Sequence, residues 1–321
     1  MICLYNPSTD PYFNLAAEEY LLKNKKEEIF MLWRNAPAII VGRFQNTLAE
    51  INLDYVKANN IKVVRRLTGG GAVFHDLGNL NYTFIANNTQ GDFRTYTAPI
   101  LKALQNLGVE AQFEGRNDLT INGQKISGNA ECVHAGRMLH HGTLLFSAEM
   151  SDLVNALKVN PLKFQDKAVK SVRKRVTNIA EHLPEPMTVL EFADCLMKQV
   201  ARENSVQWTL DEKDVKEIEV LRTEKYATWD WNFGNAPKYD FEQMGRTSGG
   251  NVEVRMSIEK SHIKEVKFYG DFFSKREISE LENLLVGTPH HYERLSEVLG
   301  CLELDEYMLN VKKEELLALM F

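Results

Sequence analysis

A run of three glycines beside two arginines is the segment of this sequence with the clearest potential for chemistry. Residues 65–76 read Arg-Arg-Leu-Thr-Gly-Gly-Gly-Ala-Val-Phe-His-Asp. Glycines let the backbone approach a ligand closely and present N–H groups to a phosphate or carboxylate, and arginines add charge-assisted contacts. Neither a Gly-Lys-Ser/Thr phosphate loop nor a helix-opening G-x-G-x-x-G pattern is present here. A glycine-rich hairpin turn with surface arginines accounts for the same pattern equally well.

A second polar group lies in residues 115–128, whose Asn-Gly pair is typical of a two-residue hairpin loop. The expected strand pairs are Ile121 with Gln124, Thr120 with Lys125, and Asp118 with Ser127. Alternation then places Asp118, Thr120, Lys125 and Ser127 on one polar face, and Leu119, Ile121 and Ile126 on the core side. A lysine beside a carboxylate and two hydroxyls could form a reaction surface, and a solvated sheet face would carry the same residues.

Residues 167–175 form a strongly basic segment, with five positive charges among nine residues. A solvated helix face, a patch that binds polyanions and a loop that folds over a phosphate would all have this composition. The segment by itself does not separate these three interpretations.

The adjacent His140 and His141 do not predict a zinc site, because neighbouring residues on a strand point to opposite faces and no third ligand stands at a suitable spacing. Cys132 is close to Lys125 in sequence and could act as a nucleophile. An isolated cysteine is more often a small buried apolar group.

Several helices and strands are expected around these segments. Asp10 as N-cap and Pro11 at the first position predict a helix, with apolar residues at helical spacing through Leu21. Residues 94–107 show helical periodicity ending at Gly108, and a capping box of Thr188 and Glu191 opens a helix that runs to about residue 202. Strands are expected at residues 29–33, 38–41, 62–65 and 79–86.

A domain boundary is expected after residues 229–237, where an aromatic cluster gives way to glycine, proline and asparagine. We expect a catalytic domain at residues 1–240 and a small α+β domain at residues 245–321. The second would contain a hairpin with a turn near Ser261 and helices at about 275–286, 290–299 and 312–320.

Composition describes an ordinary globular protein. The chain has 321 residues, is 44% hydrophobic and contains no apolar run of the ~18 residues that a membrane span requires. The N-terminal segment lacks the features of an export signal, and the four cysteines show no C-x-x-C spacing, so we expect a cytoplasmic protein. A net charge of -6 favours neither nucleic acid nor membrane as a partner.

Taken together and in order, these segments resemble the lipoate-protein ligase A family, a relative of biotin protein ligases and, more distantly, of class II aminoacyl-tRNA synthetases. The resemblance is carried by residues 65–79, 115–118, 125–128, 140–145, 171–173 and 175–178. Residues 229–237 and a small C-terminal domain also fit the layout of that family. The resemblance therefore covers nearly the whole chain.

The resemblance implies an α+β fold in which a mixed β-sheet catalytic domain precedes the small C-terminal domain. It makes Lys125 the catalytic residue, in contact with both the lipoyl carboxylate and the α-phosphate of ATP. The implied ATP- and lipoyl-adenylate-binding residues are Arg66, Gly69, Gly70, Gly71, Ala72, Val73, Phe74, His75, Asn117, Asp118, Lys125, Arg173 and Arg175. Asp118 is the implied Mg²⁺ ligand, and Trp33 and His75 are candidates for the acyl pocket.

The implied activity is ATP-dependent attachment of lipoate to a lysine through lipoyl-AMP, with ATP and Mg²⁺ as cofactors. The implied partners are lipoyl carrier domains, namely those of 2-oxoacid dehydrogenase E2 subunits and the glycine-cleavage H protein. Two alternatives stay open. One is an ATP-independent octanoyl or lipoyl acyltransferase that works through a cysteine thioester, for which Cys132 is the best-placed candidate. The other is a non-catalytic lipoate-binding protein.

Overall fold

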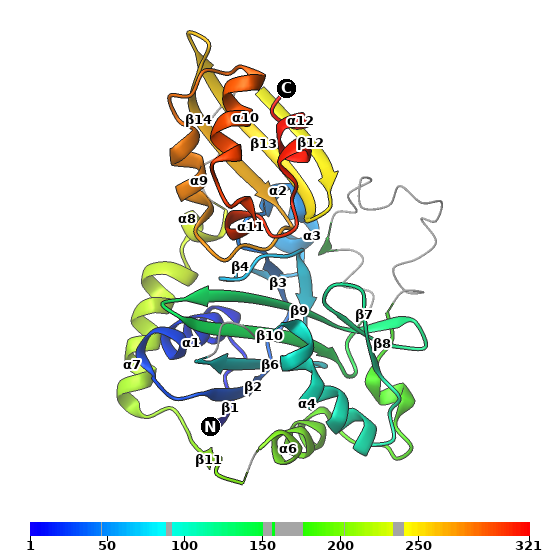
Figure 1. The fold of residues 1–321 in the computed structure, drawn as a ribbon. Coiled ribbons are helices and arrows are strands. Elements are labelled where there is room, and N and C mark those ends of the chain that lie inside the picture. The colour runs from blue at the N-terminus through cyan, green and yellow to red at the C-terminus, as the bar shows by residue number, and fades with distance from the viewer. Residues whose placement is uncertain (46, 88–91, 150–155, 158–175, 202, 234–240) are drawn as a thin grey trace.

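The computed structural model describes residues 1–45, 47–87, 92–149, 156–157, 176–201, 203–233 and 241–321. Its largest element is an eight-stranded mixed sheet in the order β11-β1-β2-β6-β10-β9-β8-β7 (Figure 1). Strand β1 pairs in parallel with β2 and β11, and the remaining neighbours are antiparallel. The strands are β1 Ile2–Asn6, β2 Ile29–Trp33, β6 Asn79–Ala86, β7 Gln112–Glu114, β8 Asp118–Ile121, β9 Gln124–His134, β10 Arg137–Leu145 and β11 Val206–Gln207. The expected α+β mixed-sheet class is confirmed.

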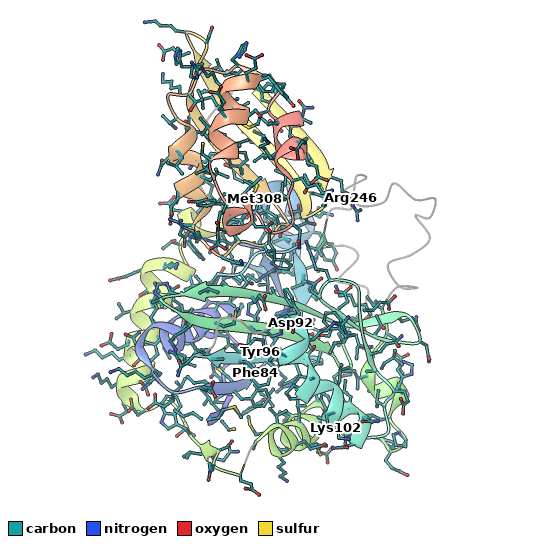
Figure 2. All side chains as sticks on the ribbon, viewed as in Figure 1. Phe84, Asp92, Tyr96, Lys102, Arg246 and Met308 are labelled. Carbon is teal, nitrogen blue, oxygen red and sulfur yellow. The ribbon has the colours of Figure 1, made fainter. Side chains whose placement is uncertain are left out.

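Helices cover both faces of this sheet, so its central strands are buried on both sides. Helices α4 Phe93–Asn106 and α6 Val189–Val200 pack on one face, where Phe84 and Tyr96 lie with ring centroids 6.0 Å apart (Figure 2). Helix α1 Pro11–Asn24 packs on the other face. Strand β2 shows the consequence, because all five of its residues are buried. A strand with two covered faces is expected to lack polar alternation.

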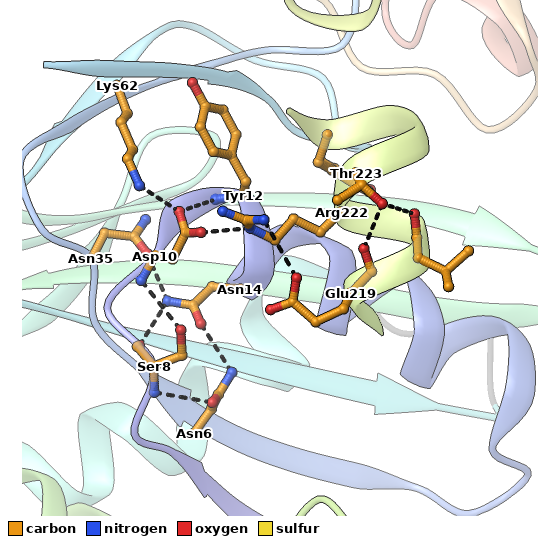
Figure 3. Close-up of polar contacts among 12 residues, drawn as sticks. Asn6, Ser8, Asp10, Tyr12, Asn14, Asn35, Lys62, Glu219, Arg222 and Thr223 are labelled. Atoms are coloured by element: carbon orange, nitrogen blue, oxygen red, sulfur yellow. Dashed lines mark hydrogen bonds and ion pairs between the residues drawn. The ribbon is translucent and has the colours of Figure 1, made fainter. Parts of the chain in front are cut away.

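Helix α1 begins where the sequence predicts, since Asp10 accepts a hydrogen bond from the Tyr12 N–H and Pro11 occupies the first turn. Asp10 also forms ion pairs with Lys62 and Arg222, which join the helix start to two distant elements (Figure 3). Arg222 begins the π-helical turn Arg222–Tyr226, which directly follows α7 Glu212–Leu221. Lys62 begins strand β4 Lys62–Arg65. The helix entrance is therefore fixed by tertiary contacts as well as by its cap.

A small sheet in the order β4-β3-β5 packs beyond α1 and carries the glycine triplet. Its strands are β3 Ala38–Val41, β4 Lys62–Arg65 and β5 Val73–His75, and the triplet lies in the β4–β5 connection. Short helices α2 Thr47–Glu50, α3 Leu53–Ala58 and α8 Trp229–Asn232 complete this part of the chain. A 3-10 turn at Ile179–His182 packs in the core of the large sheet. The strand predictions for residues 38–41 and 62–65 are confirmed.

Residues 241–321 form a three-stranded antiparallel sheet with helices packed on one side (Figure 1). The elements are β12 Phe241–Thr247, β13 Gly250–Glu259, β14 His262–Gly270, α9 Ile278–Leu285, α10 Tyr292–Gly300, α11 Leu304–Tyr307 and α12 Lys313–Ala318. The expected hairpin is present, with Ser261 in its turn at φ 63°. Strand β12 was not expected from the sequence, because its alternation is weak and most of it is exposed. Met308 lies in the core of this part (Figure 2).

The segment that follows β14 contacts the glycine triplet directly. The Gly70 N–H donates to the Phe272 carbonyl at 3.3 Å, and the Gly270 N–H donates to the Phe44 carbonyl at 2.7 Å. Phe44 and Phe272 stack with ring centroids 4.8 Å apart. A Cβ on Gly69 would lie 2.3 Å from the Phe272 oxygen, so only glycine fits there. The triplet is thus packed against the segment that follows β14.

Gly142 in β10 has no room for a side chain, so we expect its substitution to destabilise the fold strongly. A Cβ there would lie 2.2 Å from Asn129 Oδ1 and 2.6 Å from the buried Tyr82 ring, so Gly142→Ala should lower the free energy of unfolding by about 3 kcal/mol or more. Gly300→Ala is the matched control, because the nearest neighbour of its Cβ is the flexible end of the Lys313 side chain, 3.7 Å away. Urea unfolding should show no loss for Gly300→Ala. Equal stability of the two variants would contradict this packing.

Candidate active site

A cavity of about 150 Å³ lies between the small sheet and the α1 face of the large sheet. Most of the binding residues expected from the sequence line it, together with both candidates for the acyl pocket. The lining includes Trp33, Arg66, Gly70, Gly71, Ala72, Val73, His75, Asn117 and Lys125. Residues from four separate segments of the chain therefore meet at one place.

Three of the expected binding residues lie outside the cavity lining. Phe74 points to the opposite side of β5, where it packs in a core with Ile39. Gly69 lies against Phe272, and Asp118 stands at the rim, where it contacts Lys125. Arg173 and Arg175, with the rest of the basic segment 167–175, lie outside the described residues.

The Arg66 guanidinium organises the glycine triplet. Its Nη2 donates to the carbonyls of Gly69 at 2.6 Å and Gly71 at 2.9 Å, and its Nε donates to Thr68 Oγ1 at 3.0 Å. Burial lowers the pKa of Arg66 to about 10, so the group keeps its charge at neutral pH. No acidic side chain among the described residues forms an ion pair with it. A buried, charged donor on the cavity wall suits an anionic ligand.

Arg65 stabilises the fold and does not line the cavity. It is nine-tenths buried and points away from the cavity, where its guanidinium donates to the carbonyls of Gly42 and Gln45 and to Thr47 Oγ1. Of the two arginines that could add charge-assisted contacts to a ligand, only Arg66 lines the cavity. Strand alternation explains this, because adjacent residues at the end of β4 face opposite sides.

The Asn-Gly hairpin forms as expected but contains a bulge. Ile121 pairs with Gln124 and Thr120 pairs with Lys125, after which the register shifts and Asp118 pairs with Gly128. The expected pairing of Asp118 with Ser127 is therefore wrong. One extra residue in β9 turns Ser127 to the core face, where it is fully buried.

Lys125 and Asp118 form an ion pair at the cavity rim, with Nζ 2.7 Å from Oδ1. Their side chains are 38% and 35% exposed, so the pair is open to an incoming ligand. The lysine side chain lies across Gly128, where a Cβ would come within 3.0 Å of Nζ. Gly128 thus leaves the space that the ammonium occupies.

The turn that carries Asn117 is clamped to β9 by Asn129. Asn117 Nδ2 donates to the Asn129 carbonyl at 2.6 Å, and Asn129 Nδ2 donates back to the Asn117 carbonyl at 3.0 Å. The Asn129 amide oxygen accepts from the Tyr82 hydroxyl and lies 3.3 Å from His140 Nε2. Core contacts therefore fix the backbone next to Asp118.

Two buried residues near the triplet were not expected from the sequence. Glu18 accepts a hydrogen bond from Thr83 Oγ1 at 2.6 Å and lies 2.9 Å from His141 Nδ1. His141 Nε2 lies 2.8 Å from Thr68 Oγ1, which accepts from Arg66. A polar chain thus runs from α1 to the guanidinium. The available signal was an acidic pair, Glu18 and Glu19, inside an otherwise apolar helix.

Cys132 is not placed as a nucleophile. Burial raises the pKa of its thiol to about 12, and it lines a separate cavity with Met138 and Phe273. A thiol with such a pKa forms almost no thiolate at neutral pH. The geometry disfavours the thioester alternative.

The chain that follows the basic segment is anchored at Lys125. Val176 forms a parallel bridge with Lys125, and the Thr177 N–H donates to the Lys125 carbonyl at 3.1 Å. The Asn178 side chain bonds both the N–H and the carbonyl of Ala148. Residues 176–178 are therefore held beside the rim.

Comparison with known proteins agrees with this architecture. The lipoyl protein ligase A/B catalytic domain matches residues 10–201, and the bacterial lipoate protein ligase C-terminus matches residues 236–320. Lipoate-protein ligase 1 of Staphylococcus aureus is 44% identical over 98% of both chains. Lipoate-protein ligase LplJ of Bacillus subtilis is 42% identical over 97% of both.

Two solved structures show the same fold. P. falciparum LipL1 in complex with lipoate has a TM-score of 0.83 at 28% identity and covers 99% of this chain and 97% of its own. A lipoate-protein ligase A bound with ATP has a TM-score of 0.62 at 27% identity and covers 73% of this chain and 97% of its own.

Fold and cavity define a ligase-type enzyme with an apolar interior and a charged rim. The chain belongs to the lipoyl protein ligase A/B family. In the part of the chain that the structure describes, no helix has both the length and the apolar character to cross a membrane.

The position of Lys125 over Gly128 gives a test of the rim geometry. Gly128→Ala should displace the ammonium, since the added Cβ would lie 3.0 Å from Nζ. A flexible lysine end moves at little cost in stability, so the melting temperature should change little. Activity should fall on the order of 10- to 100-fold, as expected when a reacting group is misplaced by about 1 Å. Unchanged activity in steady-state kinetics would show that the position of Lys125 is not critical.

Proposed function

We propose that this protein is a lipoate-protein ligase that activates free lipoate with MgATP to lipoyl-AMP and transfers the lipoyl group to a lysine of a carrier domain. The observation that carries the proposal is the Lys125 ammonium, 38% exposed, at the mouth of a cavity that combines apolar side chains with the buried Arg66. The full-length similarity to proteins named lipoate-protein ligases supports it. So do the neighbours solved with lipoate and with ATP.

In the first half-reaction, a carboxylate oxygen of lipoate attacks the α-phosphorus of ATP, and the bond to pyrophosphate breaks. Two anions must meet for this to happen. A fixed ammonium between them lowers their repulsion and stabilises the charge that develops in the transition state. We assign that role to Lys125, which Asp118 keeps oriented until the anions arrive. We assign Arg66 and the backbone of residues 69–75 to the phosphate and nucleotide cradle.

The rim residues fit a magnesium ion that is shared with the nucleotide. Mg²⁺ usually takes one or two carboxylates and completes its coordination with phosphate oxygens and water. We assign Asp118 as the protein carboxylate and Asn117 as a neighbouring ligand to the metal or ribose. The ion would supply charge neutralisation at the phosphates. We also propose that Arg173 and Arg175 of the basic segment bind the adenylate, as the family resemblance implies.

In the second half-reaction, the ε-amino group of a carrier lysine attacks the acyl carbon and AMP leaves, without an acyl-enzyme. The carriers we propose are lipoyl domains of E2 subunits and the glycine-cleavage H protein. An archaeal bipartite lipoate protein ligase that is 31% identical to this chain is described with its E2 lipoyl domain, which supports this class of partner. Substrates of this kind are consistent with a cytoplasmic enzyme.

We also propose that the chain divides into a catalytic domain at residues 1–240 and an accessory domain at residues 245–321. The separate cores of the two parts support this division, since Phe44 is the one residue before 241 in the core of the second part among the residues described. The two family matches, at 10–201 and 236–320, support it as well.

Two substitutions separate the ligase from a thioester mechanism. Lys125→Ala removes the charge that bridges the reacting anions and should reduce ATP-dependent lipoylation of a carrier domain on the order of 10²-fold or more. Cys132→Ser should stay near wild type, because the thiol lies outside the cavity lining. Circular dichroism of both variants controls for folding. An active Lys125→Ala enzyme beside a folded but inactive Cys132→Ser enzyme would exclude the proposed mechanism.

A further inference from the structure

The inner end of the cavity contains two buried nitrogen atoms without a hydrogen-bond partner. His75 Nε2 and Asn81 Nδ2 are both enclosed, line the cavity and meet no acceptor among the described residues. The apolar residues Leu15, Ile40 and Trp33 line the same cavity, together with the buried Arg66 and His141. Leaving such a donor unsatisfied in the interior costs about 1–3 kcal/mol. This pattern indicates that a ligand brings an acceptor to the inner end.

The tautomer of His75 follows from a line of buried asparagines. Asn14 Nδ2 donates to the carbonyls of Ser8 at 3.0 Å and Arg34 at 2.8 Å, which fixes the orientation of its amide because carbonyls only accept (Figure 3). The same Nδ2 lies 2.8 Å from Asn35 Oδ1, so the Asn35 oxygen faces Asn14. The Asn35 amide nitrogen then faces His75.

Asn35 Nδ2 donates to His75 Nδ1 at 3.1 Å. Because Nδ1 is the acceptor, the ring proton of a neutral His75 must sit on Nε2, the atom that faces the cavity. Burial, with the nearby Arg66 and His141, lowers the pKa of His75 to about 3, so the ring is neutral at physiological pH. The asparagine line therefore presents a fixed, uncharged N–H donor to the ligand.

Burial shows which end of an acid substrate this donor meets. The Lys125 side chain at the rim is 38% exposed, whereas His75 and Trp33 are 3% and 2% exposed. ATP is too large for the inner end of a cavity of about 150 Å³, so the carboxylate that reacts with it has to stay near Lys125. The tail of the acid then extends inward to His75.

We propose that His75 is a specificity-determining residue whose Nε2–H donates to a sulfur of the dithiolane ring, and that Asn35 and Asn14 are positioning residues that fix its tautomer. This inference rests on the proposed function. Sulfur is a weak acceptor and also packs well at aromatic edges, which the neighbouring Trp33 indole supplies. The indole N–H is already used, since it donates to Thr83 Oγ1 at 2.9 Å. A straight-chain acid without sulfur would leave the His75 donor unsatisfied.

The test compares lipoate with octanoate, which has the same eight-carbon chain and no sulfur. His75→Leu should lower the ratio of kcat/KM for lipoate to that for octanoate on the order of 10-fold, because the donor is replaced by apolar surface. His75→Gln keeps an N–H near the position of Nε2 and should restore most of the ratio. Equal losses for both acids in His75→Leu would mean a carboxylate contact or a structural role, and would overturn the proposal.

Nitrogen-15 NMR of histidine-labelled protein tests the tautomer without any substrate. The chain has eight histidines, and the signal missing from His75→Gln identifies this one. We expect a neutral ring with its proton on Nε2 between pH 5 and 8. A proton on Nδ1 in the wild type would overturn the proposal.

Asn35→Asp tests the positioning role while His75 itself stays in place. A carboxylate accepts from Nδ1–H, so the ring proton should move from Nε2 and the preference for lipoate should fall. An Nε2 without a proton together with unchanged selectivity would contradict the proposal. Lipoylation of a carrier domain by the wild type tests the proposed function separately, so its failure is distinguishable from a failure at His75.

Discussion

In the mechanism proposed here the Lys125 ammonium stands where two anions meet, and much of the site is arranged around this requirement. The bulge in β9, the bare Cα of Gly128 and the Asp118 carboxylate together set its position at the rim. At the rim the lysine side chain is 38% exposed, so the ammonium can be reached by both anions. The interior beyond it has to be dry, because the acyl tail gains its binding energy from apolar burial. One cavity therefore needs a wet, charged mouth and a dry inner end.

The buried charges inside this protein are compatible with a dry interior because each has a defined set of partners. The Arg66 donors hold the glycine triplet, and Glu18 accepts from Thr83 and faces His141. A fully bonded polar network fixes a unique geometry in a medium of low dielectric. The His75 and Asn81 donors are the exceptions at the cavity wall, and unsatisfied buried groups of this kind are expected where a ligand binds.

Local signals predicted the elements well, and tertiary contacts explain where prediction failed. The N-cap at Asp10 and the capping box at Thr188 are present as expected, since their causes lie within a few residues. The bulge in β9 could not be derived from alternation, and it moved Ser127 to the core face. The sequence also could not show that the Arg65 guanidinium donates to the carbonyls of Gly42 and Gln45, which are distant in sequence. For Glu18 the only local signal is an acidic pair in an apolar helix, whereas Asn35 acts through partners far away in sequence and no local pattern identifies it.

Exchange of labelled pyrophosphate into ATP tests the central claim most directly, because it reports adenylation of the acid without any carrier protein. The arrangement of Lys125, Asp118 and Arg66 around an acyl cavity predicts exchange that requires both lipoate and Mg²⁺ and that stops when either is left out. Exchange in the absence of any acid would contradict this account. So would lipoylation of a carrier without ATP, since the carboxylate would then be activated by other means.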